Sequence, residues 1–476
     1  MAGLAPESVP GDDILWAPAA QIADALASRN ISCVELVEAH LARIQAVNGA
    51  LNAVIALNAE QALLDATEAD RQLARGQRRG PMHGVPITIK DSFDTRGIVT
   101  TAGTMGRRDF TPAEDATVVR RLKKAGAIVL GKTNTPELTM GGGTENPIHG
   151  RTNNPYDVSR SPAGSSGGAA AIVAAGGSAL DLGSDTGGSV RDPAHVCGVA
   201  ALKPTAGRVP LTGHIVSFDF GFVGFLTQIG PIARYVNDLA LALEVIAGPD
   251  NIDPTVAPVP LWMFGDVRPE QFRVAWFTTN GRVEAEPDVA AVTRAAAAAL
   301  VDAGAQVVEM VPPLMAETEA MYARVRDADG GSGIDRLLKR CGTDTPTDKL
   351  RARMERAHTV SAAELSDTFE RMERLRSGML RFLDEFDVLV CPPALHAAVP
   401  PERLATSTYE DWAFQTAFNV TGWPAVVVRA GQTGEGLPVG VQIVAGPWRE
   451  QIALRAAKLV EDALGGYVAP SLQALT

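Results

Sequence analysis

The sequence predicts an α/β fold, in which a β-sheet is covered by helices. Between Gly84 and Gly213, short apolar runs of strand length alternate with longer stretches of helical periodicity, and this alternation is typical of a sheet with covering helices. The chain has 476 residues, of which 46% are hydrophobic. This is enough apolar material for the sizeable core that such a fold requires.

The chain opens with a part that we expect to be helical, over residues 17–74. Apolar residues recur there at the spacing of one helix face, as Val34 and Leu41 illustrate. Ser32 precedes this pattern and Glu35 follows it three places later, which is the arrangement of a capping box at a helix N-terminus. A helix should therefore begin directly after Ser32.

The central part of the chain, residues 84–250, should form the alternating strands and helices of the sheet. It is dense in glycine, and its short apolar runs are bounded by residues that favour turns. We expect strands at 85–89, 127–130 and 179–182, and helices at 116–126, 169–175 and 237–247.

The rest of the chain should return to the sheet after a helical interruption. Residues 313–381 are charged, helical in period and poor in strand signals, so we interpret them as a helical insertion or cap near the cleft. We see no internal repeat and no low-complexity tail, and we expect a single domain over residues 1–476. The remaining strands are expected at 272–277, 386–390, 425–428 and 439–444, and the remaining helices at 288–304 and 451–464.

Charge and cysteine content limit the classes of partner. The net charge is -12 and the pI is about 5.2, which argues against nucleic acid as a partner, because binding to phosphates depends on clustered Lys and Arg.

No stretch approaches the roughly 20 apolar residues of a membrane span, and the segment Met1 to Trp16 lacks the pattern of a secretory signal. The four cysteines lie too far apart in sequence for a zinc site or a disulfide framework. We expect a cytoplasmic monomer or homodimer with reduced thiols.

Two Gly/Ser-rich loops carry the strongest chemical signal. The first reads Ser161-Pro-Ala-Gly-Ser165-Ser166-Gly-Gly and the second reads Gly183-Ser-Asp-Thr-Gly-Gly-Ser189. A flexible linker has a similar composition, but linkers do not alternate with helices and strands. Glycine permits positive φ and close backbone approach, so the end of the second loop can point successive N–H groups into one concavity. A tetrahedral oxyanion requires such a concavity, and Ser189 is then the candidate nucleophile.

A serine nucleophile needs a base, and the residues leave two alternatives. Gly164-Ser-Ser166-Gly-Gly168 fits the G-x-S-x-G pattern of a nucleophile elbow, for which one of the seven histidines would be the base. The residues before Ser166 form a polar, proline-containing stretch, however, where an elbow requires a strand. The other candidate base is Lys90, at the end of the apolar run 85–89. Burial by such a strand would lower the pKa of the lysine and make its neutral amine available near pH 7.

Seven motifs, taken in order along the chain, resemble those of the amidase signature family. Together they span most of the chain, and such a set is far more specific than any single motif. The spacing of Lys90, Ser165 and Ser189 also suits the Ser-Ser-Lys triad of that family. The motifs are Gly84-Val-Pro-Ile-Thr-Ile-Lys90-Asp, Gly131-Lys-Thr-Asn-Thr-Pro-Glu137, Ala163-Gly-Ser-Ser-Gly-Gly168, Asp185-Thr-Gly-Gly-Ser-Val-Arg191, Cys197-Gly-Val-Ala-Ala-Leu-Lys-Pro-Thr205, Gly230-Pro-Ile-Ala-Arg234 and Gly436-Leu-Pro-Val-Gly-Val-Gln442.

The resemblance implies a fold and a set of catalytic roles. The fold would be a mixed, twisted β-sheet with helices on both faces, and residues 84–250 would be its catalytic core. Ser189 would be the acylated nucleophile, Ser165 a bridging serine that follows a cis peptide bond after Gly164, and Lys90 the base. No metal and no cofactor is implied.

The resemblance also implies supporting roles near the triad. The oxyanion would be held by the N–H groups of Thr186, Gly187, Gly188 and Ser189. From the residues themselves, Asp185 and Arg191 flank the second loop with opposite charges and are expected to brace it, and Ser166 is a third supporting residue.

The substrate is expected to be a small molecule with an apolar or aryl group. The segment His214 to Phe225 is aromatic and rich in glycine, and if its phenylalanines line the cleft they would favour such a group. An aryl acylamidase or a urethanase-type enzyme fits this expectation, with amides, anilides, carbamates and esters as candidate substrates. The expected pocket residues are Met140, Gly141, Gly142, Phe218, Phe220, Phe222 and Phe225.

Two other functions remain as alternatives. The first is the glutaminase subunit of a tRNA-dependent amidotransferase, but glutamine needs charged partners for its α-amino and α-carboxylate groups, and the aromatic segment supplies few. The second is a non-catalytic binding protein on the same scaffold. The intact set of Lys90, Ser165 and Ser189 argues against it.

Overall fold

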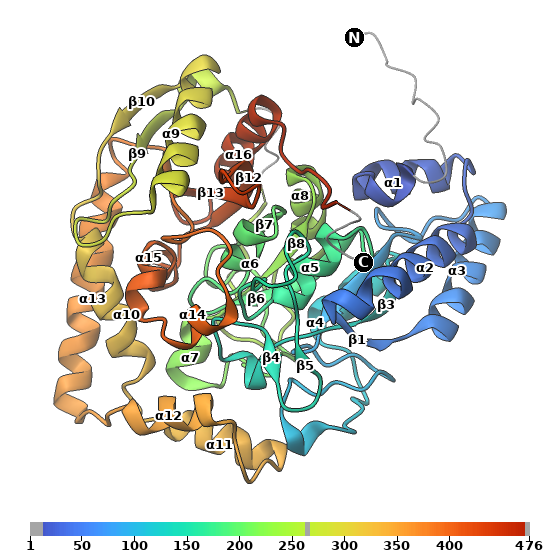
Figure 1. Cartoon of the computed structure of the whole chain (residues 1–476), viewed down its shortest axis with the longest axis horizontal. Coiled ribbons are helices and arrows are strands. Elements are labelled where there is room, and N and C mark those ends of the chain that lie inside the picture. Colours follow the sequence, from blue (N-terminus) through green and yellow to red (C-terminus); the bar gives the residue numbers. More distant parts are fainter. Residues whose placement is uncertain (1–12, 262–266, 472–476) are drawn as a thin grey trace.

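Eleven strands form one mixed β-sheet in the computed structural model, which describes residues 13–261 and 267–471 (Figure 1). The order of the strands across the sheet is β1-β3-β2-β6-β8-β7-β12-β13-β11-β9-β10. This confirms the predicted α/β class. The strands are β1 Val54–Leu57, β2 Pro86–Lys90, β3 Ile128–Thr133, β6 Leu180–Asp185, β7 Ala200–Lys203, β8 Gln228–Ala233, β9 Arg273–Trp276, β10 Gln306–Glu309, β11 Val388–Cys391, β12 Ala425–Gln432 and β13 Pro438–Ala445. A separate two-stranded sheet pairs β4 Glu145–Asn146 with β5 Gly150–Arg151.

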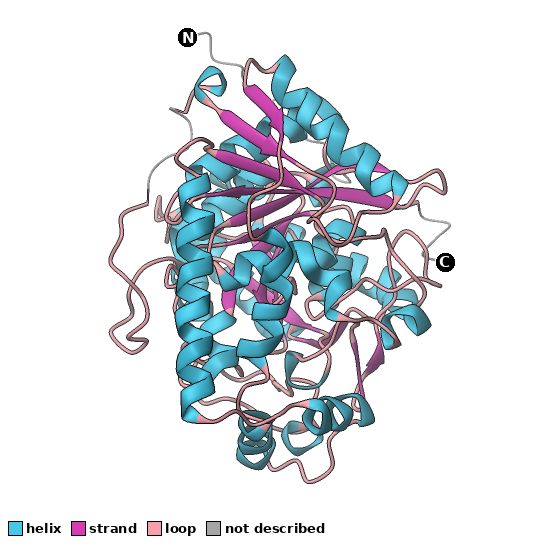
Figure 2. Cartoon of the chain, turned by 90° about the vertical axis from the view of Figure 1, so that its left-hand side faces the viewer, coloured by secondary structure: helices cyan, strands magenta, loops and turns pink. Residues whose placement is uncertain are grey.

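Helices cover both faces of the twisted sheet (Figure 2). The side chains of β12 show why two layers are needed, since Val426 and Val428 join one core cluster with α9 and α16, while Val427 joins another with α6. The helices are α1 Ala19–Ala27, α2 Cys33–Leu51, α3 Ala59–Ala74, α4 Thr117–Lys124, α5 Gly167–Ala174, α6 Arg191–Val196, α7 Gly221–Leu226, α8 Val236–Ile246, α9 Pro287–Asp302, α10 Thr318–Arg326, α11 Ser332–Cys341, α12 Asp348–Arg356, α13 Ala362–Phe382, α14 Pro401–Ala405, α15 Ala413–Val420 and α16 Glu450–Leu464.

The N-terminal part is helical with one exception. The capping box is present, because the Ser32 hydroxyl accepts a hydrogen bond from the Glu35 N–H and the Glu35 carboxylate accepts one from the Ser32 N–H. Residues 17–74 also hold β1, which the expected all-helical part did not include. This strand pairs antiparallel with β3 and forms one edge of the sheet. Four residues are too few for a periodic pattern to separate a strand from a helix turn.

The segment 313–381 contains four α-helices, α10 to α13, one short 3-10 helix at Met315–Glu317, and no strand. Side chains of α13 pack with those of α10 and α15 in one apolar cluster, which includes Met372 and Phe418. Two of the four helices, α10 and α12, contribute side chains to the cavity described below. The helical content of this segment therefore agrees with its charged, strand-poor sequence.

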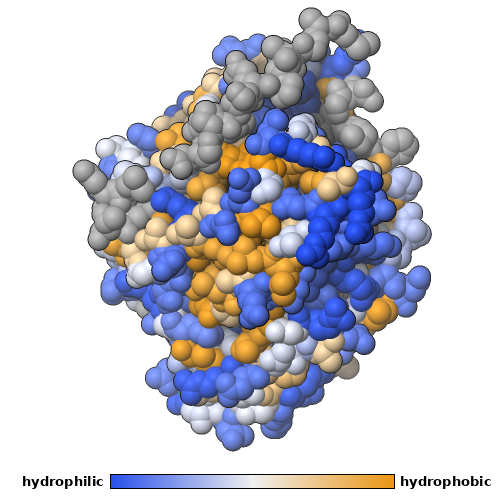
Figure 3. Space-filling view, turned by 90° about the vertical axis from the view of Figure 1, so that its right-hand side faces the viewer, coloured by the Kyte–Doolittle hydropathy of each residue, from blue (hydrophilic) through white to orange (hydrophobic). Residues whose placement is uncertain are grey.

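The surface is mixed in polarity. No helix of the described residues is long and apolar enough to cross a membrane. On the side that lies to the right in Figure 1, apolar side chains gather in the middle and hydrophilic ones surround them (Figure 3). All four cysteines are unpaired and buried. Residues 1–12, the larger part of the segment tested for a secretory signal, lie outside the described residues.

Candidate active site

Lys90 is buried at the end of β2 and faces a group of serines. Its Nζ donates hydrogen bonds to the hydroxyl oxygens of Ser165 at 2.8 Å, Ser166 at 3.0 Å and Ser184 at 3.0 Å. The neighbouring Asp91 does not pair with it, because that carboxylate accepts from the N–H of Thr101. Burial lowers the pKa of Lys90 to about 7, although nearby carboxylates oppose this effect. A substantial share of Lys90 is therefore a neutral amine at neutral pH.

Ser165 is held in a tight loop just before α5. The peptide bond between Gly164 and Ser165 is cis, as the resemblance implied. A side chain at Gly164 would come within 2.8 Å of the Gly143 backbone, so only glycine fits there. The Thr135 hydroxyl donates to the Ser165 carbonyl at 3.0 Å. These contacts fix the Ser165 hydroxyl next to Lys90.

Ser189 lies in the loop between β6 and α6. The two Gly/Ser-rich loops meet here, because the Ser166 N–H donates to the Ser189 carbonyl at 3.2 Å. The glycines before Ser189 are required by close neighbours: a Cβ at Gly187 would overlap the Tyr322 hydroxyl, and a Cβ at Gly188 would overlap the Gln415 side chain. Gly188 also has φ near +121°, which other residues rarely adopt.

The N–H groups of this loop do not all point the same way. The Gly188 N–H donates to the Asp185 carboxylate at 2.8 Å, so the predicted set of four oxyanion donors loses Gly188. Within the described part of the chain, the N–H groups of Thr186, Gly187 and Ser189 donate to no protein acceptor. All three residues line the cavity. The corrected set of candidate donors is therefore three N–H groups.

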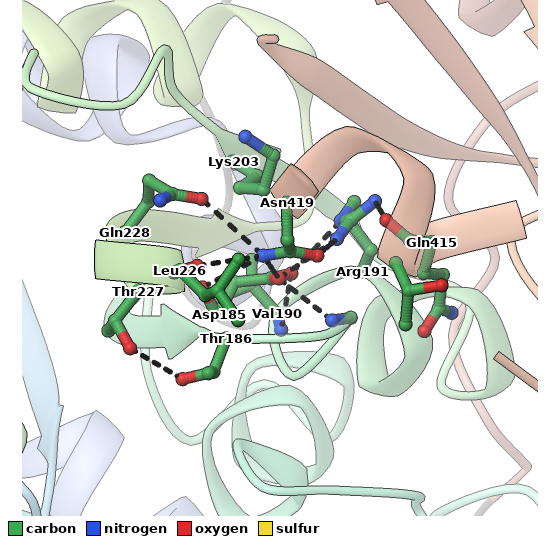
Figure 4. Close-up of polar contacts among 12 residues, drawn as sticks. Asp185, Thr186, Val190, Arg191, Lys203, Leu226, Thr227, Gln228, Gln415 and Asn419 are labelled. Carbon is green, nitrogen blue, oxygen red and sulfur yellow. Dashed lines mark hydrogen bonds and ion pairs between the residues drawn. The ribbon is translucent and has the colours of Figure 1, made fainter. Parts of the chain in front are cut away.

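A buried ion pair braces the loop (Figure 4). The Arg191 guanidinium donates to both oxygens of Asp185, at 2.9 and 3.0 Å, and neither side chain is exposed. It also donates to the side-chain oxygens of Asn419 and Gln442, both at 2.6 Å. Burial opposes the charge on Asp185, but the positive charge of Arg191 outweighs it and holds the pKa of Asp185 well below its ordinary value. Asp185 and Arg191 thus hold the loop as the sequence predicted, and Ser166 contributes through its N–H.

Two residues of this network come from distant parts of the chain. Asn419 lies in α15, and its amide donates to the Asp185 carboxylate at 2.9 Å. Gln442 lies in β13 and ends one of the seven motifs. That motif is a local signal for Gln442. Asn419 has no comparable signal, because only the fold brings α15 to the loop.

A cavity of about 750 Å³ opens onto Ser189. Its wall includes Met140, Gly141 and Gly142, as expected, and the loop residues from Thr186 to Ser189. Ser165 and Lys90 are not in the wall, since they lie buried behind it. A substrate in the cavity would therefore meet Ser189 first.

The four phenylalanines expected in the pocket lie elsewhere. Phe218 and Phe220 pack into apolar clusters, Phe222 packs near Phe369, and Phe225 is 42% exposed at the surface. Of the described segment His214 to Phe225, only Val216 and Val223 line the cavity. The expectation was wrong because an amphipathic turn such as α7 presents the residues between the phenylalanines to the cavity.

Several residues of the cavity wall were missed from the sequence. They come from α10, α12, α15 and the segment before α15, and no motif marks them. The most notable are Tyr322, Arg326, Arg353, Trp412 and Gln415.

The histidines do not form a nucleophile elbow with Ser166. His195 bridges the His396 carbonyl and the Gly440 N–H, and His214 bonds to the backbone of Val216. Among the described residues, no histidine forms a hydrogen bond with Ser166. No strand leads into that serine either.

Comparison with known proteins identifies the family. The Amidase family model matches residues 35–454. The chain belongs to the amidase signature family. The chain is 38% identical to an acylamidase of Rhodococcus erythropolis, over 93% of the chain and 94% of that relative. It is 36% identical to a glutamyl-tRNA(Gln) amidotransferase subunit from Moorella thermoacetica, over 94% of the chain and 97% of that relative.

A solved structure shows the same fold. The 6-aminohexanoate cyclic dimer hydrolase superimposes on this chain with a TM-score of 0.85 and 31% sequence identity, over 97% of the chain and the whole of that structure. The mixed sheet with helices on both faces is therefore the fold of the family.

Proposed function

We propose that this amidase is a serine amidohydrolase that cleaves C–N acyl bonds through an acyl-enzyme on Ser189. The observation that carries the proposal is the 2.8 Å contact between Lys90 and Ser165, directly behind the cavity wall that includes Ser189. A lysine with a pKa of about 7 is a suitable base at neutral pH. Amide hydrolysis is the activity of the family to which the chain belongs.

The proposed reaction uses three groups in turn. The Ser189 hydroxyl attacks the substrate carbonyl, and its proton passes to Ser165 while the Ser165 proton passes to neutral Lys90. The N–H groups of Thr186, Gly187 and Ser189 stabilise the oxyanion. The relay then runs in reverse and protonates the leaving nitrogen, which departs as an amine and leaves an ester on Ser189. Water attacks that ester through the same relay and releases the acid.

The substrate range is best tested with a panel. An acylamidase is among the relatives, so anilides and aliphatic amides are the first choice. Aryl carbamates and esters follow, because the same triad chemistry accepts them if they fit the cavity. We expect the wild-type enzyme to turn over at least one amide, and Ser189→Ala to turn over none. If Ser189→Ala retained activity while Ser166→Ala lost it, the nucleophile would be Ser166 instead.

Labelling with a serine-directed fluorophosphonate separates an enzyme from a binding protein. We expect stoichiometric labelling of the wild-type chain and no labelling of Ser189→Ala. A wild-type chain that resists the probe would support a non-catalytic scaffold.

One observation favours a second candidate, the glutaminase subunit of an amidotransferase. The cavity wall contains Arg326 and Asp327, a pair of charges that could meet the α-carboxylate and α-amino groups of glutamine. The aromatic segment His214 to Phe225 supplies few such partners. Ammonia release from glutamine, compared with amine release from anilides, distinguishes the two functions, and co-purification with a second subunit would support the glutaminase.

A further inference from the structure

Three arginines stand in the wall of the cavity that contains Ser189, and among the described residues two of them, Arg326 and Arg353, have a buried Nε without a hydrogen-bond acceptor. Arg326 is the last residue of α10, and Arg353 lies in α12. Both belong to the helical segment 313–381, whose helices α10 to α12 lie at the lower left of Figure 1. Neither takes part in the proposed proton relay.

Arg353 has a positive charge without a partner. Among the described residues it forms no ion pair and no hydrogen bond, and its Nε is buried without an acceptor. Burial, followed by the positive charge of Arg326, lowers the pKa of Arg353 to about 10. A guanidinium that is partly removed from water and lies near a second one is unfavourable unless an anion joins them.

The acidic residues of the cavity wall already have partners. The Asp327 carboxylate accepts from the Tyr409 hydroxyl at 2.8 Å and lies 4.0 Å from the Arg326 guanidinium. Glu145 pairs with a lysine at 3.6 Å. Glu137 accepts hydrogen bonds from a threonine hydroxyl and from a backbone N–H. None of these carboxylates pairs with Arg353.

Arg326 lies on the same helix as Tyr322, a residue that contacts the nucleophile loop. The Tyr322 hydroxyl sits against Gly187 of the nucleophile loop, and Arg326 follows Tyr322 by one helical turn on α10, a rise of roughly 6 Å. The apolar side chains of Val223 and Leu350 also line the cavity. The wall therefore combines the nucleophile loop, apolar side chains and cationic groups.

We infer that the amides taken by this enzyme carry a carboxylate, which Arg353 and Arg326 bind while the scissile carbonyl lies at Ser189. The inference rests on the proposed function, because it assumes that Ser189 is the nucleophile. A guanidinium is well suited to a carboxylate, since its N–H groups can bind both oxygens at once. The sequence predicts a substrate with an apolar or aryl group, whereas this inference predicts a substrate with a carboxylate.

Matched substrate pairs test the inference. The first pair is glutaric acid monoanilide and its isostere with an isopropyl group in place of the carboxylate. The second pair is N-acetyl-para-aminobenzoate and para-isopropylacetanilide, which moves the carboxylate to the amine side. We expect the wild-type enzyme to have a higher kcat/KM for the carboxylate member of at least one pair, by a factor on the order of ten to a hundred, the range for a hydrogen bond to a charged group.

Variants of α12 assign the preference to Arg353. Arg353→Met keeps length and removes charge, so it should lose the preference by lowering the kcat/KM for the carboxylate member far more than that for the isopropyl member. Arg353→Lys should restore part of the preference. The matched control is Arg351→Met, on the same helix, since Arg351 is exposed, pairs with Asp348 and does not line this cavity. It should behave as wild type.

The outcomes separate the two proposals. If the wild type had a kcat/KM for the isopropyl member equal to or higher than that for the carboxylate member in both pairs, the carboxylate inference would be overturned. The amidase proposal would remain intact. A preference that survives in Arg353→Met, or an equal loss for both members of a pair, would also overturn it. If the wild type cleaved none of the four compounds or the panel amides, or if Ser189→Ala cleaved them, the proposed function itself would fail.

Discussion

The side chain of Lys90 sets the expected pH dependence of the reaction. Its pKa is lowered to about 7 by burial, and the proposed mechanism needs the neutral amine. Turnover of a neutral anilide should therefore rise about tenfold per pH unit below 7 and level off above it. The measurement is kcat/KM from pH 5 to 9 with an anilide that does not itself titrate. A rate that falls as the pH rises through 7 would contradict a lysine base.

Replacing the proposed base should have a far larger effect than replacing any histidine. Lys90→Ala removes the titratable side chain that donates to Ser165, so we expect kcat to fall by roughly a thousandfold or more. His214→Asn should cost less than about tenfold, because His214 bonds only to backbone groups among the described residues. Steady-state kinetics on both variants, with circular dichroism as a folding control, checks this order. The reverse order would favour a histidine base.

The pair formed by Asp185 and Arg191 should be important for stability as well as for loop geometry. Arg191→Met leaves the Asp185 carboxylate buried without its cation, which we expect to cost about 3 to 5 kcal/mol in the free energy of unfolding. Because the pKa of Asp185 is depressed, this contribution is present above the ordinary aspartate range and is lost only in strong acid. Urea denaturation at pH 5 and pH 8 should show a similar loss at both. An unchanged unfolding midpoint would contradict the role of the pair.

At the scale of elements, α10 packs directly against the nucleophile loop. A Cβ at Gly187 would overlap the Tyr322 hydroxyl, so Gly187→Ala should displace either the loop or α10 and reduce kcat/KM by roughly a hundredfold. Adding Tyr322→Phe removes the overlapping oxygen and should recover part of the loss. The double-mutant cycle measures this coupling. Additive effects of the two changes would show that the loop and α10 act independently.

The sequence predicted the elements that carry the triad better than the surroundings of the substrate. The strand that ends at Lys90 and the loops of Ser165 and Ser189 are marked by apolar runs and by glycine, both of which are local signals. Asn419 and Arg353 are not marked, because their roles depend on how α15 and α12 pack against the loop. The pocket phenylalanines were wrong for a related reason, since composition does not tell which face of a short helix meets a cavity.

Across the whole molecule, the catalytic loops depend on strands from the end of the chain. The edge of β7 pairs with β12, and β12 pairs with β13, so the middle of the sheet joins residues 84–250 to residues beyond 420. Arg191 crosses the same boundary to reach Asn419 and Gln442. Residues 84–250, which the sequence predicts as the catalytic core, therefore need contacts with residues beyond 420 to complete the sheet and the catalytic loops.

A fragment that stops at residue 250 should not fold by itself. Without β12, the backbone groups of β7 lose their partner in the centre of the sheet, and the apolar side chains of that strand become exposed. We expect the fragment 1–250 to be insoluble or to bind hydrophobic dyes, and to resist fluorophosphonate labelling at Ser189. Co-expression with the fragment 251–476 should restore soluble, labelled protein, because it returns β12, β13 and Asn419 together. A soluble fragment 1–250 that labels alone would show that the first half of the sheet is an independent folding unit.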